Sequence, residues 1–228
     1  MKKPSVSRRR FLTSTLAGAA AVGALPATLK GQQPPAPAKT GRYQDYLVYN
    51  DPKETLEDAT GEDIEGPFYR PGAPFRSTLF EKGARGEILV VSGKVVARNG
   101  RALAGVVLDI WQCNADGRYD NDDSEHPPRK DQFVMRGKVK TDEKGEYEFT
   151  TIKPVAYRIG PQDKDFRPAH IHLKAGAEGY QALTTQIYFK GDKFNANDPW
   201  YKKSREIDPK ADEKKVLRAT FKVVLARA

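Results

Sequence analysis

Two histidines lie two residues apart in the segment Arg-Pro-Ala-His-Ile-His-Leu, residues 167–173. In an extended strand, alternate side chains point to the same face, so His170 and His172 should present two imidazoles side by side. Imidazole is the commonest metal-ligating side chain near neutral pH. Because two of the chain's three histidines occur here, the spacing suggests a metal site. A pair of exposed strand histidines would show the same pattern, so the other motifs have to decide between these interpretations.

Several further motifs occur in a fixed order around this pair. They occupy residues 65–69, 91–119, 151–157 and 185–192. Together with the histidine segment, they resemble the intradiol ring-cleavage dioxygenases, the family of protocatechuate 3,4-dioxygenase and catechol 1,2-dioxygenase. The resemblance covers roughly residues 63–192 and implies an intradiol dioxygenase-like enzyme with a catalytic β-sandwich.

The resemblance implies a ferric iron whose ligands carry over, motif by motif, to Tyr119, Tyr157, His170 and His172. A phenol has a pKa near ~10 and is mostly protonated at neutral pH, but a highly charged cation favours its phenolate form. Two phenolates are hard anionic donors that suit Fe(III) better than Fe(II), in contrast to sites with two histidines and one carboxylate. Either tyrosine taken alone would also fit as a core or interface aromatic residue.

The resemblance further implies roles around the substrate. Arg167 would stabilise negative charge that develops on a catechol, and Gln186 would help to orient the substrate. Tyr157 would leave the metal when the catechol binds as a dianion, and would then act as a base. The implied reaction with O2 cleaves the bond between the hydroxyl-bearing carbons and gives a cis,cis-muconate. A surface salt bridge for Arg167 and a cross-strand polar pair for Gln186 are the simpler alternatives.

Two departures from the family pattern limit the choice of substrate. Arg158 and Ile159 follow Tyr157, where protocatechuate-type members carry Pro-Trp, so we expect a different pocket wall. The chain also lacks room for the helical N-terminal dimerisation region of catechol 1,2-dioxygenases. By exclusion it resembles the protocatechuate-type core. Protocatechuate, catechol and hydroxyquinol all stay open as substrates, as do a homo-oligomer and the need for a partner subunit.

Two other classes of protein remain as alternatives. An exported β-sandwich that only binds a partner has no need of two tyrosines and two histidines in one constellation. An Fe(II) extradiol enzyme or a zinc hydrolase would need a carboxylate ligand near His170, and none of the motifs supplies one.

The elements expected to position these residues are short strands. Val, Ile, Tyr, Phe and Thr are frequent in seven segments, with Gly, Asn and Asp between them. The segments are residues 87–97, 105–112, 136–141, 146–152, 169–175, 183–189 and 219–225. Strands without intervening helices predict an all-β fold, a β-sandwich of the intradiol dioxygenase type with long loops and few short helical turns.

Turn signals complete this expectation. Asn99-Gly100 and residues 143–145 are typical of hairpin turns. Short helical turns are expected near residues 53–59 and 198–207. The polar segment 121–131 contains two consecutive prolines and predicts a loop, in which His126 should be solvated.

Residues 1–31 have the features of an export leader. They carry six Lys and Arg residues and no acid, and a twin arginine, Arg8-Arg9, precedes Phe-Leu and a short apolar run. This pattern resembles a Tat signal, although an ordinary Sec leader or a basic tail would share its charge. We expect residues 32–42 to be a Pro- and Ala-rich linker and residues 43–228 to be the catalytic domain. The expected location is the periplasm or cell envelope, with membrane contact only during export.

The leader also explains most of the net charge. The whole chain carries +9, and without residues 1–31 the charge falls to about +3. The basic composition is therefore poor evidence for nucleic-acid binding, which requires a basic patch on the folded domain. Cys113 is the only cysteine, so no disulfide can form within the chain. The expected partners are a catechol-type small molecule and O2.

The twin arginine gives a direct test of the export route. Replacing Arg8 and Arg9 by lysine should keep the protein in the cytoplasm, because the Tat signal depends on the arginine pair. Cell fractionation followed by immunoblotting measures this. Export at the unaltered level would rule out the Tat route.

Overall fold

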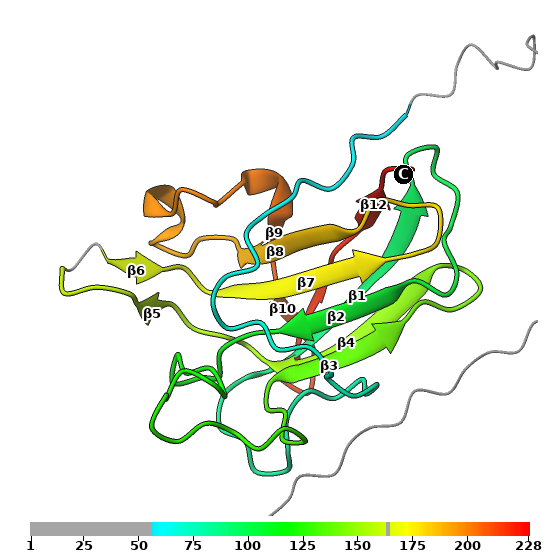
Figure 1. The fold of residues 1–228 in the computed structure, drawn as a ribbon. Helices are drawn as coiled ribbons and strands as arrows, with labels where there is room; N and C mark the ends of the chain where they lie inside the picture. Colours follow the sequence, from blue (N-terminus) through cyan, green and yellow to red (C-terminus); the bar gives the residue numbers. More distant parts are fainter. Residues whose placement is uncertain (1–55, 163–164) are drawn as a thin grey trace, which may run out of the picture. The chain divides into compact units, whose positions relative to one another are not determined.

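The computed structural model describes residues 56–162 and 165–228. They form a β-sandwich, as expected, with long loops and short 3₁₀ turns (Figure 1). The strands are β1 (Ile88–Ala97), β2 (Val107–Trp111), β3 (Arg136–Lys140), β4 (Glu146–Ile152), β5 (Tyr157–Arg158), β6 (Phe166–Arg167), β7 (His170–Gly176), β8 (Leu183–Phe189), β9 (Glu206–Ile207), β10 (Lys210–Ala211), β11 (Leu217–Thr220) and β12 (Val223–Leu225). The 3₁₀ turns are η2 (Asn195–Asn197) and η3 (Lys203–Arg205).

Two sheets make up the sandwich, and a small hairpin adds to them. The first sheet has the order β3-β2-β7-β8-β9. In the second, β4 pairs antiparallel with one edge of β1, while β11 and β12 both pair in parallel with the other edge. The strands β5 and β6 form a separate two-stranded sheet, which Figure 1 shows beyond the ends of β7 and β8.

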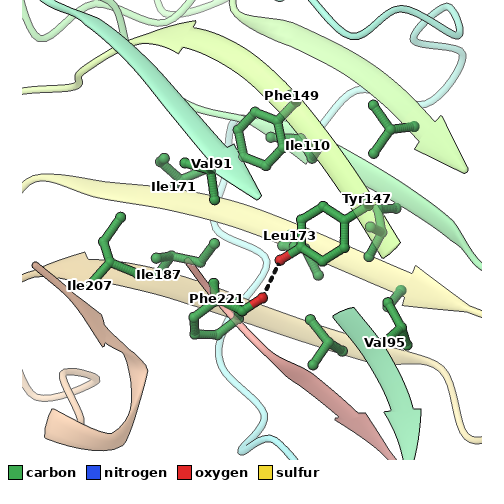
Figure 2. Close-up of a cluster of buried hydrophobic side chains, with 14 of the residues drawn as sticks. Val91, Val95, Ile110, Tyr147, Phe149, Ile171, Leu173, Ile187, Ile207 and Phe221 are labelled. Atoms are coloured by element: carbon green, nitrogen blue, oxygen red, sulfur yellow. Dashed lines mark hydrogen bonds between the residues drawn. The ribbon is translucent and has the colours of Figure 1, made fainter. Parts of the chain in front are cut away.

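The hydrophobic core lies between the two large sheets. Val91 of β1 and Phe149 of β4 face Ile171 and Leu173 of β7 and Ile187 of β8, and all five are fully buried (Figure 2). Burying each such side chain contributes about 1.5–3 kcal/mol relative to leaving it exposed. This contact fixes which face of β7 points inward, and therefore which face is left for other residues.

Six of the seven predicted strands agree with β1, β2, β3, β4, β7 and β8 to within two residues. The seventh, residues 219–225, is interrupted at Phe221 and Lys222 and so forms β11 and β12. Its register against β1 is the same on both sides of the interruption, since Ser92 pairs with Thr220 and Val95 with Val223. The short strands β5, β6, β9 and β10 were not predicted, because two residues are too few to show an alternation.

The interruption has a local cause. The Phe221 carbonyl accepts a hydrogen bond of 2.6 Å from the Tyr147 hydroxyl of β4 (Figure 2). The backbone amide of Val95 in β1 donates to the Gly145 carbonyl, and not to the carboxy-terminal strand. A Cβ atom on Gly93 would lie 1.9 Å from the Phe221 oxygen, so only glycine leaves room for this crossing. The tyrosine hydroxyl thus ties β4 to the carboxy-terminal strand across β1.

The predicted hairpin at residues 143–145 is wrong. The turn itself is present, with the Gly145 amide donating to the Asp142 carbonyl. However, β3 and β4 belong to different sheets, so the turn carries the chain across the sandwich. The Asn99-Gly100 turn likewise closes only one antiparallel bridge, between Val96 and Ala102.

The two helical predictions had mixed outcomes. A 3₁₀ turn, η3, lies within the segment 198–207. Residues 56–59 have no helix, and residues 53–55 lie outside the described part of the chain. The leader, the linker and the first residues of the predicted domain also lie outside it. No helix within residues 56–162 and 165–228 is long and apolar enough to cross a membrane.

The crossing at Gly93 provides a stability test. Gly93→Ala should lower the free energy of unfolding by about 3 kcal/mol, because the new methyl group would overlap a backbone oxygen that cannot move freely. Gly176→Ala is the matched control, since a Cβ on this β7 glycine would meet nothing within 4 Å. Urea unfolding of both variants gives the comparison. Equal stability of the two variants would contradict the close crossing.

Candidate functional site

Strand β7 separates the two histidines from the core. His170 and His172 lie on one face, whereas Ile171 and Leu173 lie on the opposite face within the hydrophobic core. Both imidazoles are almost completely buried, so the interpretation as exposed strand histidines is wrong. The expected side-by-side arrangement is present, with the two Nε2 atoms 3.2 Å apart.

Neighbouring groups orient each imidazole differently. His170 Nδ1 lies 2.7 Å from the Pro168 carbonyl, to which it can only donate, so its Nε2 atom keeps the lone pair. His172 stacks face to face on Trp111 of β2, with ring centroids 4.7 Å apart and an interplanar angle of 6°. Its Nδ1 atom has no hydrogen-bond partner within the described residues. Stacking against Trp111 therefore contributes to fixing the orientation of the His172 ring.

Two tyrosines complete the cluster from outside the large sheets. Tyr119 lies in the loop after β2, and its hydroxyl oxygen is 3.3 Å from His170 Nε2. Tyr157 belongs to β5, and its ring meets Tyr119 edge to face at a centroid distance of 5.7 Å. The approach depends on Gly117, which has a φ of +74° and on which a Cβ would lie 2.9 Å from the Tyr157 Cβ.

Burial keeps all four groups uncharged in the absence of a metal. It lowers the pKa of His170 to about 3, with a further contribution from the Arg167 cation. It also lowers the pKa of His172 well below its usual value. The pKa values of Tyr119 and Tyr157 are raised, again mainly by burial. Neutral imidazoles can act as ligands directly, whereas the phenols need a cation to ionise.

This donor set fits a metal ion. Within the described residues, no three His, Cys, Asp or Glu side chains gather in a metal-binding cluster, so the tyrosines have to complete any ligand set. Metal–nitrogen bonds are about 2.0–2.1 Å long in zinc sites. Two nitrogens bound to one such ion therefore lie about as far apart as the two histidine Nε2 atoms, which are separated by 3.2 Å. Two imidazoles and two phenols match Fe(III) better than Fe(II) or Mg²⁺.

Arg167 lies beside this cluster and is buried, so the interpretation as a surface salt bridge is wrong. It pairs with Tyr157 across the β5–β6 hairpin. Its Nε atom donates to Asp198, and its Nη2 atom donates to Gln186 Oε1 at 2.7 Å. Burial alone would lower the pKa of Arg167, but the Asp198 carboxylate raises it overall. The Trp200 ring covers the guanidinium at 4.7 Å.

Gln186 connects Arg167 to a second buried group. It is the cross-strand neighbour of His172, as one of the alternatives held, and its side chain also reaches beyond that pair. Its Nε2 atom donates to Asp63 Oδ1 at 3.2 Å, and Tyr188 donates to the other Asp63 oxygen at 2.9 Å. Because the Asp63 carboxylate can only accept, the Gln186 amide nitrogen must point toward Asp63. The amide oxygen of Gln186 then points toward Arg167 and accepts its hydrogen bond.

Three residues of the site carry no local sequence signal. Asp198 lies 31 residues beyond Arg167, and Asp63 lies 123 residues before Gln186. Trp111 is a buried strand residue whose neighbour becomes known only from the pairing of β2 with β7. In contrast, His126 is highly exposed in its loop, as predicted.

A cleft of about 700 Å³ opens over Tyr119 and Tyr157. Its walls come from the segment before β1, the loop after β2, the β5–β6 hairpin and the loop that follows η2. The lining residues are Ile64, Pro67, Phe68, Asp116, Gly117, Arg118, Tyr119, Asp122, Ala156, Tyr157, Arg158, Ile159, Phe166, Arg167 and Trp200. The cleft brings a small molecule within reach of the tyrosines and of Arg167.

The sequence matches a known family model. Residues 64–225 match the model described as Dioxygenase. Chlorocatechol 1,2-dioxygenase from Rhodococcus opacus is 35% identical over 156 residues, which cover 61% of this chain and 60% of the relative. The beta chain of protocatechuate 3,4-dioxygenase from Burkholderia cepacia is 37% identical over 123 residues, 53% of this chain and 52% of the relative. The chain therefore spans only part of the length of these curated relatives.

A solved structure agrees with these matches. The crystal structure of 3-chlorocatechol 1,2-dioxygenase from Rhodococcus opacus 1CP superposes with a TM-score of 0.67 and 28% sequence identity. The superposition covers 81% of this chain and 78% of that one. The likeness extends over the sandwich and is not restricted to the motifs around the histidines.

The buried imidazoles make the stability of the metal-free protein depend on pH. An unfolded chain protonates its histidines near pH 6.5, whereas His170 and His172 stay neutral in the folded protein far below that pH. The unfolded state thus binds more protons, and stability falls as pH is lowered through 6.5. Between pH 6.5 and 5.5 the loss should be about 1 kcal/mol per histidine.

Urea unfolding of metal-free protein at several pH values measures this loss. His170→Gln should remove about half of the pH dependence. His126→Gln, which changes a highly exposed histidine outside this cluster, is the control. A free energy of unfolding that does not change over this pH range would show that the imidazoles are not held neutral.

Proposed function

Because the chain belongs to the intradiol ring-cleavage dioxygenase family, we propose that it uses O2 to cleave a catechol between its two hydroxyl-bearing carbons. The product would be a cis,cis-muconate-type dicarboxylate. The observation that carries this proposal is the convergence of Tyr119, Tyr157, His170 and His172 in one cluster, whose two tyrosines line the cleft. Catechol substrates in the names of the relatives support the same reaction class.

We further propose that Tyr119, Tyr157, His170 and His172 hold one Fe(III) ion. The fit rests on the donor chemistry and on the spacing of the histidine nitrogens. When bound, ferric iron would hold the catechol as a dianion and make its ring electron-rich enough to react with O2. The protein then has to supply proton acceptors, charge stabilisation and alignment.

The two tyrosines should have different roles. Tyr119 is buried between His170 and the stacked ring of Phe68, so it is held from several sides. Tyr157 lines the cleft from the small β5–β6 hairpin and is only half-buried. We propose that Tyr157 gives way to the catechol and that its phenolate oxygen accepts a catechol proton, whereas Tyr119 stays in place.

Arg167 and Gln186 complete the proposed machinery. The Arg167 cation lies at the wall of the cleft, where it can stabilise negative charge on a bound catecholate. Asp198 and Gln186 fix the direction of the guanidinium from behind, and Trp200 limits its contact with water. We assign Gln186 to positioning Arg167, because its amide group is occupied by Arg167 and Asp63.

We also propose that the protein acts outside the cytoplasm. This rests on the twin-arginine leader alone. A Tat route would export a chain that had already folded and bound its metal.

Iron content and colour test the proposed centre. Purified protein should contain about one ferric iron per chain and absorb visible light through tyrosinate-to-iron charge transfer. Removal of the iron should abolish both the colour and O2 uptake in the presence of catechols. A colourless protein after iron reconstitution, or one that binds zinc more tightly, would exclude the proposed centre.

Substitution separates the roles of the two tyrosines. Tyr157→Phe should keep most of its iron, because a ligand that leaves during turnover matters less for resting affinity. Its substrate-binding and product-release steps should be slower. Tyr119→Phe should lose both iron and activity. Tyr180→Phe, which changes a tyrosine outside the cleft, is the control. The measurements are iron content and single-turnover kinetics, and equal iron loss in the Tyr119 and Tyr157 variants would overturn the assigned roles.

A further inference from the structure

The cleft is much larger than a single catechol ring. Its volume of about 700 Å³ lies within the range of about 300–1,000 Å³ that is usual for sites of drug-sized ligands. A second groove of about 390 Å³ adjoins it. Ile159, Phe166, Arg167 and Trp200 line both, so the space over the tyrosines continues past Trp200. A ligand can therefore extend well beyond the ring that reaches the tyrosines.

Large apolar side chains are exposed on the walls of this extension, beside the polar side chains of Asp165, Asn197 and Asp198. Ile159 is 60% exposed and Trp200 is 37% exposed. Both lie at the opening of the cleft, where Phe166 and Phe68 add aromatic surface. Exposed large apolar side chains that gather at a cleft indicate a binding surface, because leaving them in water is unfavourable.

The charged side chains around the cleft are already engaged. Arg118 pairs with Asp122 at 3.1 Å, and Asp116 pairs with Arg85 at 2.9 Å. Arg167 is held by Asp198.

Arg158 is engaged as well. Its Nη1 atom donates to three carbonyls of residues 160–162, and its guanidinium lies 4.8 Å from the centre of the Phe166 ring. Apart from Arg167, which we assign to the catecholate oxygens, every arginine among the described lining residues is thus already engaged, and none is left to pair with a carboxylate on the ring of a substrate. Burying such a carboxylate here would be unfavourable.

We propose that this site prefers catechols that carry a bulky apolar substituent, an aryl or branched alkyl group, over catechol itself and over ring carboxylates. The catechol hydroxyls face the tyrosines, and the substituent lies against Ile159 and Trp200. This inference rests on the proposed function, since it takes the tyrosine-lined part of the cleft as the reacting end. It makes Ile159 a specificity-determining residue, at a position where the sequence led us to expect a different pocket wall.

The test compares three substrates with the iron-loaded full chain. We expect kcat/KM, measured by O2 uptake, to be at least about tenfold higher for 4-phenylcatechol than for catechol or protocatechuate, as apolar pocket contacts allow. Anaerobic titration calorimetry of the same compounds should give the same order of affinity. Equal or better use of catechol or protocatechuate would overturn this inference and leave the proposed reaction standing.

A pair of matched variants locates the preference. Ile159→Asn should lower kcat/KM for 4-phenylcatechol roughly tenfold while leaving that for catechol within about twofold. Ile88→Asn makes the same change at an exposed isoleucine outside the cleft and should alter neither value. A loss for both substrates in Ile159→Asn, or no loss for either, would contradict the assigned contact. If 4-phenylcatechol binds best but no compound is cleaved, the inference is supported and the proposed reaction fails.

Discussion

Strand β7 is buried on both faces, and its two-residue period decides what each face carries. Ile171 and Leu173 fill the space between the sheets, while His170 and His172 face the loops that hold the tyrosines. A register shift by one residue would move both imidazoles into the hydrophobic core. The packing that drives the two sheets together therefore also holds the two histidines in place.

The charge of Arg167 is the second constraint on the site. A buried guanidinium needs a partner, and Asp198 supplies it without approaching the histidines. The cation still helps to keep His170 and His172 unprotonated. One ion pair thus serves two purposes, since it makes a positive group available at the wall of the cleft and keeps two neutral nitrogens free to bind a cation.

The sequence predicted the features that depend on neighbouring residues. Alternation placed the histidines on one face of β7, and the motif resemblance singled out Tyr119 and Tyr157, whose rings lie in contact in the folded chain. Features that depend on distant segments were not predictable. The turn at residues 143–145 has the composition of a hairpin turn, but the residues around it carry no signal that β3 and β4 belong to different sheets. The pairing of Asp198 with Arg167 likewise depends on how the loop after η2 folds back.

The β5–β6 hairpin has a consequence for the energetics of turnover. The histidines belong to a five-stranded sheet, whereas Tyr157 belongs to a sheet of only two short strands. An isolated two-stranded hairpin is marginally stable at best in water. We therefore expect local opening to require less free energy around Tyr157 than around β7, so that a small displacement there need not involve global unfolding. The tyrosine that we propose as the exchanging ligand thus lies on one of the smallest sheets in the described part of the chain.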